Sequence, residues 1–85
     1  MKTVIHKDAL KALAHMQPKR ARQIRDAIAA VAANPGAPGV DLVRLQGFDN
    51  AFRVRVGDWR VIVRRDGDTL FVTRIAPRGD VYKRK

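Results

Sequence analysis

Residues 51–63 read AFRVRVGDWRVIV, and this stretch decides the fold. Apolar and polar side chains alternate on both sides of a central Gly-Asp pair, which is typical of two β-strands joined by a two-residue turn. Such a hairpin places Val56 opposite Trp59, and counting back along both strands places Arg55 opposite Arg60. The sequence therefore predicts an antiparallel hairpin with a defined register.

This register sorts the side chains of the hairpin onto two faces. The face expected to meet the helices carries Phe52, Val54, Val56, Trp59, Val61 and Val63. The opposite face carries Ile62 and four arginines, namely Arg53, Arg55, Arg60 and Arg64. A slip of one residue would bury the arginines and expose the valines, so the hydrophobic pattern specifies the register strongly.

The arginine face has two interpretations. Arginines on the open face of an antiparallel sheet are often no more than a solvated surface. However, Arg55 facing Arg60 places like charges directly opposite each other, which costs up to about 1 kcal/mol, and a bound anion would relieve that repulsion. All four charged positions are arginine and none is lysine, and the guanidinium group is suited to forked contacts with phosphate. This preference favours a phosphate-binding surface.

The first part of the chain predicts a short strand and two helices. Residues 1–5 are expected to form the strand, and residues 7–16 a helix whose apolar face carries Leu10, Leu13 and Ala14. A second helix is expected from the proline at position 18 to the Asn-Pro-Gly at 34–36. Its apolar residues recur at spacings of three and four: Ala21, Ile24, Ile28 and Val31.

Two further runs, residues 40–45 and 69–76, predict strands before and after the hairpin. The expected fold class is therefore α+β, with an N-terminal strand and a helical hairpin packed on one face of a mainly antiparallel sheet. Residues 1–85 are expected to form a single domain, because so short a chain cannot bury two cores.

Composition restricts the partners and the chemistry. The net charge of +10 predicts a polyanionic partner or an acidic protein that neutralises it. The absence of cysteine excludes disulfides and a zinc finger, and His6 and His15 have no partner at metal-ligand spacing, so we expect neither a metal nor a cofactor. We find no signal peptide and no membrane span in the sequence, and therefore expect a cytoplasmic protein with no membrane partner.

Three motifs together resemble the RelE/ParE superfamily of small bacterial type II toxins. They are the Leu-Gln-Gly at residues 45–47, the hairpin FRVRVGDWRVI at residues 52–62, and the closing IAPRGDVY at residues 75–82. The hairpin is similar to a family pattern of an aromatic residue, alternating basic residues and Gly-Asp-aromatic-Arg. The closing motif is similar to the family's arginine followed by Val-Tyr. The resemblance covers nearly the whole chain.

The resemblance implies a RelE-like toxin that cleaves mRNA on the ribosome by metal-independent attack of the ribose 2′-hydroxyl. It implies catalytic roles for Arg60 at the pentacovalent phosphate, for Arg78 near the scissile bond, and for Tyr82 in stacking or proton transfer. The side chains expected to bind RNA are those of Arg53, Arg55, Arg64, Lys83, Arg84 and Lys85. The implied partners are the ribosome, mRNA and a cognate acidic antitoxin.

Two alternatives remain open. Pro77 replaces the histidine that many members carry before the closing arginine, and the hairpin has Arg53 and Arg55 where some efficient members have lysine. Because arginine is a poor proton acceptor, the chain also fits a ParE-like inhibitor of DNA gyrase. A basic RNA-binding module without enzymatic activity is the third possibility, although Phe52 and Trp59 are assigned to the core and leave few aromatics for stacking.

Overall fold

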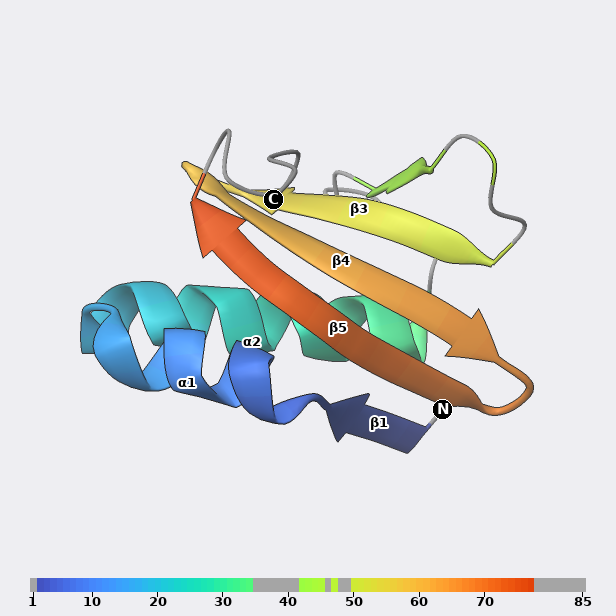
Figure 1. The fold of residues 1–85 in the computed structure, drawn as a ribbon, viewed down its shortest axis with the longest axis horizontal. Helices are drawn as coiled ribbons and strands as arrows, with labels where there is room; N and C mark the ends of the chain where they lie inside the picture. Colours follow the sequence, from blue (N-terminus) through green and yellow to red (C-terminus); the bar gives the residue numbers. More distant parts are fainter. Residues whose placement is uncertain (1, 35–41, 46, 48–49, 78–85) are drawn as a thin grey trace.

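The computed structural model describes residues 2–34, 42–45, 47 and 50–77. Five strands and two helices follow one another as β1 (Lys2–Ile5), α1 (Lys7–His15), α2 (Pro18–Ala33), β2 (Leu42–Arg44), β3 (Ala51–Val56), β4 (Trp59–Asp66) and β5 (Thr69–Pro77). The strands form one sheet in the order β1-β5-β4-β3-β2, in which β1 runs parallel to β5 and the other neighbours are antiparallel. Both helices cover one face of this sheet (Figure 1). The predicted α+β class is confirmed.

The predicted hairpin register is also confirmed. Val56 pairs with Trp59 and Arg55 pairs with Arg60 across β3 and β4. Strand β4 continues three residues beyond the predicted end at Val63, because its pairing with β5 extends to the next two-residue turn. Each of these two turns begins with a glycine at a φ of +60°, which a residue other than glycine adopts only with strain.

The core lies between the helices and the inward face of β3, β4 and β5. Its buried members are Ala9, Leu13, Ile24, Ile28, Val31, Val54, Val61, Val63, Leu70, Val72 and Ile75. Phe52, Val56 and Trp59 are partly buried against this core, as the alternation in the hairpin predicts. Because the inward face is filled by apolar packing, the polar side chains of the hairpin are left on the face that the helices do not cover.

Helix α1 uses a different face from the one predicted. Leu13 is buried as expected, but Leu10 is 44% exposed and Ala14 is also exposed. The buried stripe instead contains Ala9, four residues before Leu13, where a small side chain lets the helix approach β5 closely. The side chain of His6 caps this helix by accepting a hydrogen bond of 3.1 Å from the backbone N–H of Asp8, which gives that histidine a structural role.

None of the helices in the described part of the chain is long and apolar enough to cross a membrane.

Candidate functional site

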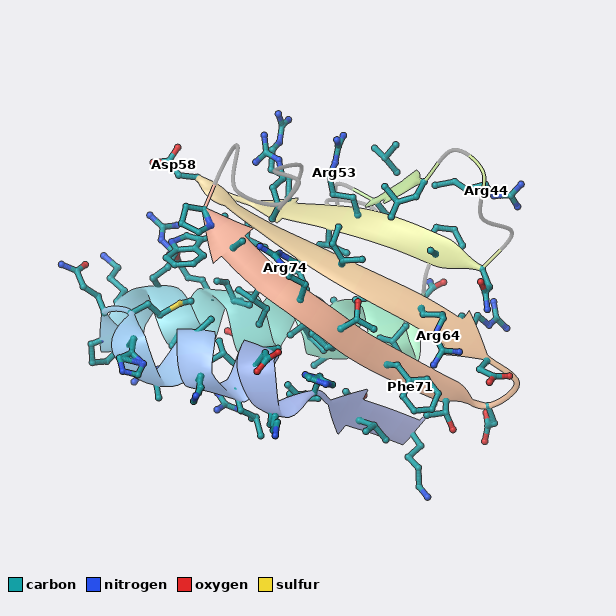
Figure 2. The ribbon with its side chains drawn as sticks, viewed as in Figure 1. Arg44, Arg53, Asp58, Arg64, Phe71 and Arg74 are labelled. Atoms are coloured by element: carbon teal, nitrogen blue, oxygen red, sulfur yellow. The ribbon has the colours of Figure 1, made fainter. Side chains whose placement is uncertain are left out.

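Four arginines gather on the sheet face opposite the helices. The register of β3, β4 and β5 places them there, and we call this group the arginine cluster: Arg53, Arg55, Arg60 and Arg74. Three of these residues are predicted from the hairpin alone, whereas Arg74 of β5 is not. Figure 2 labels Arg53 on β3 and Arg74 on β5, with β4 running between these strands.

Arg60 is the centre of the arginine cluster. It lies directly opposite Arg55, whereas Arg53 and Arg74 both pair with Ile62, two residues further along the same strand. Arg53 and Arg74 are therefore diagonal neighbours of Arg60, at about 7–8 Å on the two adjacent strands. The two strands on either side of β4 thus place positive charge around Arg60.

The guanidinium of Arg60 is buried and poorly supplied with acceptors. The residue is only 9% exposed, and its Nε and Nη1 atoms have no hydrogen-bond partner within the part of the chain that the structure describes. A guanidinium cannot escape this situation by losing its proton, and a buried cation is costly unless an anion pairs with it. An anion with two or more oxygen acceptors, such as phosphate, would supply the partners that this group lacks once Nε and Nη1, which are shielded from solvent, become accessible.

The surroundings of the arginine cluster strengthen its electrostatic effect. The cross-strand neighbours of the four arginines among the described residues are either other members of the cluster or the apolar residues Val43, Ile62 and Ala76. Ala76, which pairs with Arg60, is itself only 5% exposed. Charges near low-dielectric surroundings interact more strongly than charges in open water, an effect that is largest for the buried Arg60 and smaller for the exposed Arg55 and Arg74. This end of the sheet face is suited to holding a phosphodiester backbone.

Arg64 lies on the same face but outside the cluster. Its Cζ atom is 4.6 Å from the centroid of the Phe71 ring, and its Nη1 is 3.5 Å from Oδ2 of Asp66. Figure 2 shows Arg64 beside Phe71 near the turn between β4 and β5, away from Arg53 and Arg74. The structure thus brings three of the predicted hairpin arginines together and gives the fourth other partners.

The remaining predicted site residues are Arg78, Tyr82, Lys83, Arg84 and Lys85, which lie outside the described residues. Their proposed roles therefore rest on the sequence. Among the described residues, no group of three or more His, Cys, Asp or Glu side chains is placed to hold a metal ion.

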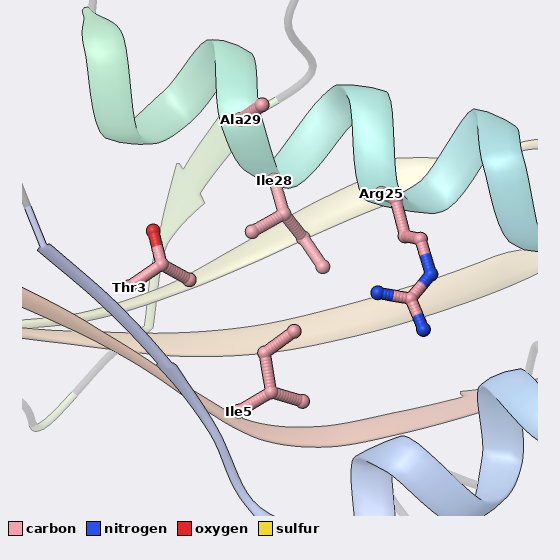
Figure 3. A pocket seen from close by; sticks show the side chains of 5 residues that line it. All are labelled: Thr3, Ile5, Arg25, Ile28 and Ala29. Carbon is pink, nitrogen blue, oxygen red and sulfur yellow. The ribbon is translucent and has the colours of Figure 1, made fainter.

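A small open pocket lies on the other side of the sheet. It has a volume of about 180 Å³ and is lined by Thr3, Ile5, Arg25, Ile28 and Ala29, from β1 and α2 (Figure 3). The lining is mostly apolar, with Arg25 as its charged member. Because β1 and α2 contribute this lining, the pocket takes no part in the arginine cluster on the opposite face.

Residues 4–82 match the family described as the ParE toxin of the type II toxin-antitoxin system, parDE. The matched residues include the hairpin, the arginine cluster and the closing motif. RelE1 of Methanocaldococcus jannaschii, a putative toxin, is 33% identical over 82 residues, an alignment that covers 93% of this chain and 91% of that relative.

Several solved structures have a similar fold, among them two complexes of RelE with RelB. The RelE-RelB complex from Pyrococcus horikoshii has a TM-score of 0.79 at 25% identity, with 93% of this chain and 96% of that chain covered. The RelB-RelE antitoxin-toxin complex from Methanococcus jannaschii has a TM-score of 0.77 at 23% identity, with 94% and 95% covered.

Proposed function

Because the chain belongs to the ParE toxin family of type II toxin-antitoxin systems, we propose that it is a ribosome-dependent endoribonuclease that cleaves mRNA and thereby inhibits translation. The observation that carries this proposal is the buried guanidinium of Arg60, whose Nε and Nη1 lack acceptors among the described residues. A phosphate of an RNA backbone supplies acceptor oxygens of the charge and shape that this group requires.

In the proposed reaction, the ribose 2′-oxygen attacks the adjacent phosphorus while the bond from phosphorus to the 5′-oxygen breaks. The 2′-hydroxyl loses its proton and the departing 5′-oxygen gains one, which leaves a 2′,3′-cyclic phosphate and a 5′-hydroxyl. Negative charge develops on the equatorial oxygens of the pentacovalent phosphate, where preorganised cations lower the barrier most effectively. We assign this role to Arg60, with Arg53 and Arg55 holding neighbouring phosphate oxygens.

Proton transfer in this reaction requires groups other than the arginine cluster, because a guanidinium has no acceptor atom. We assign proton transfer to Tyr82 and place Arg78 near the scissile bond. Arg64 and the basic residues 83–85 are proposed to contact the RNA backbone outside the reacting phosphate. The in-line geometry of attack requires a fixed mRNA conformation, which we assign to the ribosome. The protein is therefore expected to be nearly inert on free RNA.

We also propose a cognate antitoxin as the neutralising partner. Two of the similar solved structures, from Pyrococcus horikoshii and Methanococcus jannaschii, are complexes of RelE with RelB. With a net charge of +10, this chain is complementary to an acidic antitoxin segment that folds as it binds and covers the basic surface. We place both the proposed mRNA cleavage and its neutralisation by the antitoxin in the cytoplasm, where ribosomes translate mRNA.

The test of the proposed nuclease is a reconstituted bacterial translation reaction in which mRNA ends are mapped by primer extension. New ends are expected when ribosomes are present and not when the same mRNA is incubated without them. Arrested translation with unchanged mRNA ends would overturn the nuclease assignment. Strongly salt-dependent RNA binding, with neither cleavage nor arrest, would identify a nonenzymatic RNA-binding module.

Inhibition of DNA gyrase without RNA cleavage is the second candidate function. Two observations favour it: the matching family is described as ParE, and the arginine cluster contains no proton acceptor. A supercoiling assay with purified gyrase distinguishes the two functions. Inhibited supercoiling together with intact mRNA would select the gyrase inhibitor.

A further inference from the structure

Strand β5 contains a β-bulge beside the arginine cluster. Val63 of β4 pairs with Val72, but the preceding residue Ile62 pairs with Arg74, so Thr73 is an extra residue on β5. A bulge of this kind shifts the alternation of all residues that follow it on the same strand. It is the one register shift within the pairing of β4 with β5 in the described chain.

The bulge determines which face Arg74 occupies. Val72 and Ile75 are both buried in the core, at 1% and 6% exposure, although strict alternation would put residues three apart on opposite faces. Without the bulge, Arg74 would share the inward face with Val72, and Ile75 would point away from the core. With the bulge, Ile75 packs inward and Arg74 joins the outward arginines.

The side chain of Thr73 fastens the bulge to β4. Its Oγ1 donates a hydrogen bond of 3.2 Å to the backbone carbonyl oxygen of Ile62. Ile62 is the residue that Arg53 and Arg74 flank from opposite sides. The hydroxyl therefore fixes the extra residue to β4 at the level where Arg74 is oriented.

We propose that Arg74 contacts a backbone phosphate of the RNA substrate and that Thr73 is the positioning residue that orients it. This inference rests on the proposed function. Arg53 and Arg55 provide cations on the β3 side of Arg60 only, and Arg74 provides the matching cation on the β5 side. A phosphate held by Arg60 is then enclosed by positive charge from both neighbouring strands.

The binding test uses a six-nucleotide uridine oligoribonucleotide and measures its dissociation constant at several salt concentrations. For single-stranded RNA the logarithm of the binding constant falls with the logarithm of salt by about 0.7 per phosphate contact, so Arg74→Gln should reduce this slope by about 0.7. Arg74→Lys keeps the charge and should retain the slope.

Arg65→Gln is the matched control for this binding test. Arg65 is an exposed arginine of β4 that pairs with the buried Leu70 and therefore lies on the other face of the sheet. Arg65→Gln should leave the slope unchanged.

The positioning role of Thr73 is tested in the same assay and in the translation reaction. Thr73→Val removes the hydroxyl at nearly constant shape and should weaken binding and cleavage in the same direction as Arg74→Gln. Thr73→Ser keeps a hydroxyl and should restore both binding and cleavage, while circular dichroism checks that each variant is folded.

The expected loss of cleavage for Arg74→Gln is about tenfold or more, equivalent to about 1.4 kcal/mol or more of transition-state stabilisation.

The outcomes separate this inference from the proposed function. A wild-type protein that binds the oligonucleotide but leaves mRNA ends unchanged refutes the nuclease, and the salt slope still decides the role of Arg74. A wild-type slope and a wild-type cleavage rate in Arg74→Gln overturn the role of Arg74. Normal binding by folded Thr73→Val overturns the positioning role of Thr73.

Discussion

Arg55 and Arg60 lie directly opposite each other across the β3–β4 hairpin, on the sheet face that the helices leave open. Directly opposed like charges weaken a hairpin. Arg60 is also buried, and two nitrogen atoms of its guanidinium have no hydrogen-bond acceptor among the described residues. The inward valines of the same strands offset this cost by filling the core. The hairpin thus uses one face for stability and presents on the other the arginines of the proposed anion site.

Replacing Arg60 is expected to reduce activity without reducing stability. Arg60→Gln removes the repulsion from Arg55, so the free energy of unfolding should stay constant or rise by up to about 1 kcal/mol. Cleavage should fall about 100- to 1,000-fold, the usual effect of losing one group that stabilises transition-state charge. Urea unfolding and mRNA end mapping measure the two effects.

Arg65→Gln is the control for this prediction, because it removes the same charge from β4 on the opposite face. It should leave cleavage close to wild type. An Arg60→Gln protein that is clearly less stable than wild type would show that Arg60 has a partner that holds the fold together, and would contradict the anion site.

The hairpin and the overall architecture could be predicted from sequence because both depend on periodic patterns. The alternation around Gly57 determined the pairing of Arg55 with Arg60, and the helical spacing of Ile24 and Ile28 identified the buried face of α2. In each case the residues that carry the pattern also form the core. Burial of these residues therefore fixes the placement of their polar neighbours.

Arg74 and the packing of α1 could not be predicted, for different physical reasons. The bulge at Thr73 interrupts the alternation of β5, and its hydrogen bond to Ile62 depends on the neighbouring strand. In α1, two possible apolar stripes share Leu13, and the close approach of the helix to β5 selects the stripe with the smaller residue, Ala9. Both outcomes are set by contacts between elements distant in sequence.

The two turn glycines give a matched test of backbone strain. Gly57→Ala and Gly67→Ala should each lower the free energy of unfolding by about 1–3 kcal/mol, because both glycines have a φ of +60°. At Gly57 an added Cβ would also lie 2.6 Å from Nη1 of Arg20, whereas at Gly67 nothing lies within 4 Å. Arg20 can swing aside at the loss of its 2.8 Å hydrogen bond to Gln23, so the extra cost should be no more than about 1 kcal/mol.

Adding Arg20→Ala to each glycine variant separates the two contributions. The second substitution should remove the difference in denaturant unfolding between the Gly57→Ala and Gly67→Ala backgrounds. A Gly67→Ala variant that loses more stability than Gly57→Ala would contradict this account of the turns.

Two leucines of α1 test the corrected helix face. Leu13→Ala should lower the free energy of unfolding by about 2–5 kcal/mol, because the side chain is only 3% exposed and its loss leaves a cavity. Leu10→Ala should cost less than about 1 kcal/mol, because that side chain is 44% exposed. Thermal and urea unfolding of both variants measure the difference. Equal losses of unfolding free energy in the two variants would show that the buried face of α1 includes Leu10, as the sequence predicted.

Arg64 tests how far the functional surface extends along the sheet. Arg64→Gln removes the contact with Phe71 and should lower the free energy of unfolding by about 0.5–1 kcal/mol. Because Arg64 lies outside the arginine cluster and its proposed contact with the RNA backbone is away from the reacting phosphate, the substitution should lower cleavage less than Arg53→Gln, which removes a member of the cluster. Phe71→Leu is the matched control, since it removes the ring without changing the charge and should reduce stability alone. If Arg64→Gln lowers cleavage as strongly as Arg53→Gln, the contact of Arg64 with RNA is as important for the reaction as that of the arginine cluster, and RNA must displace Asp66 from Arg64.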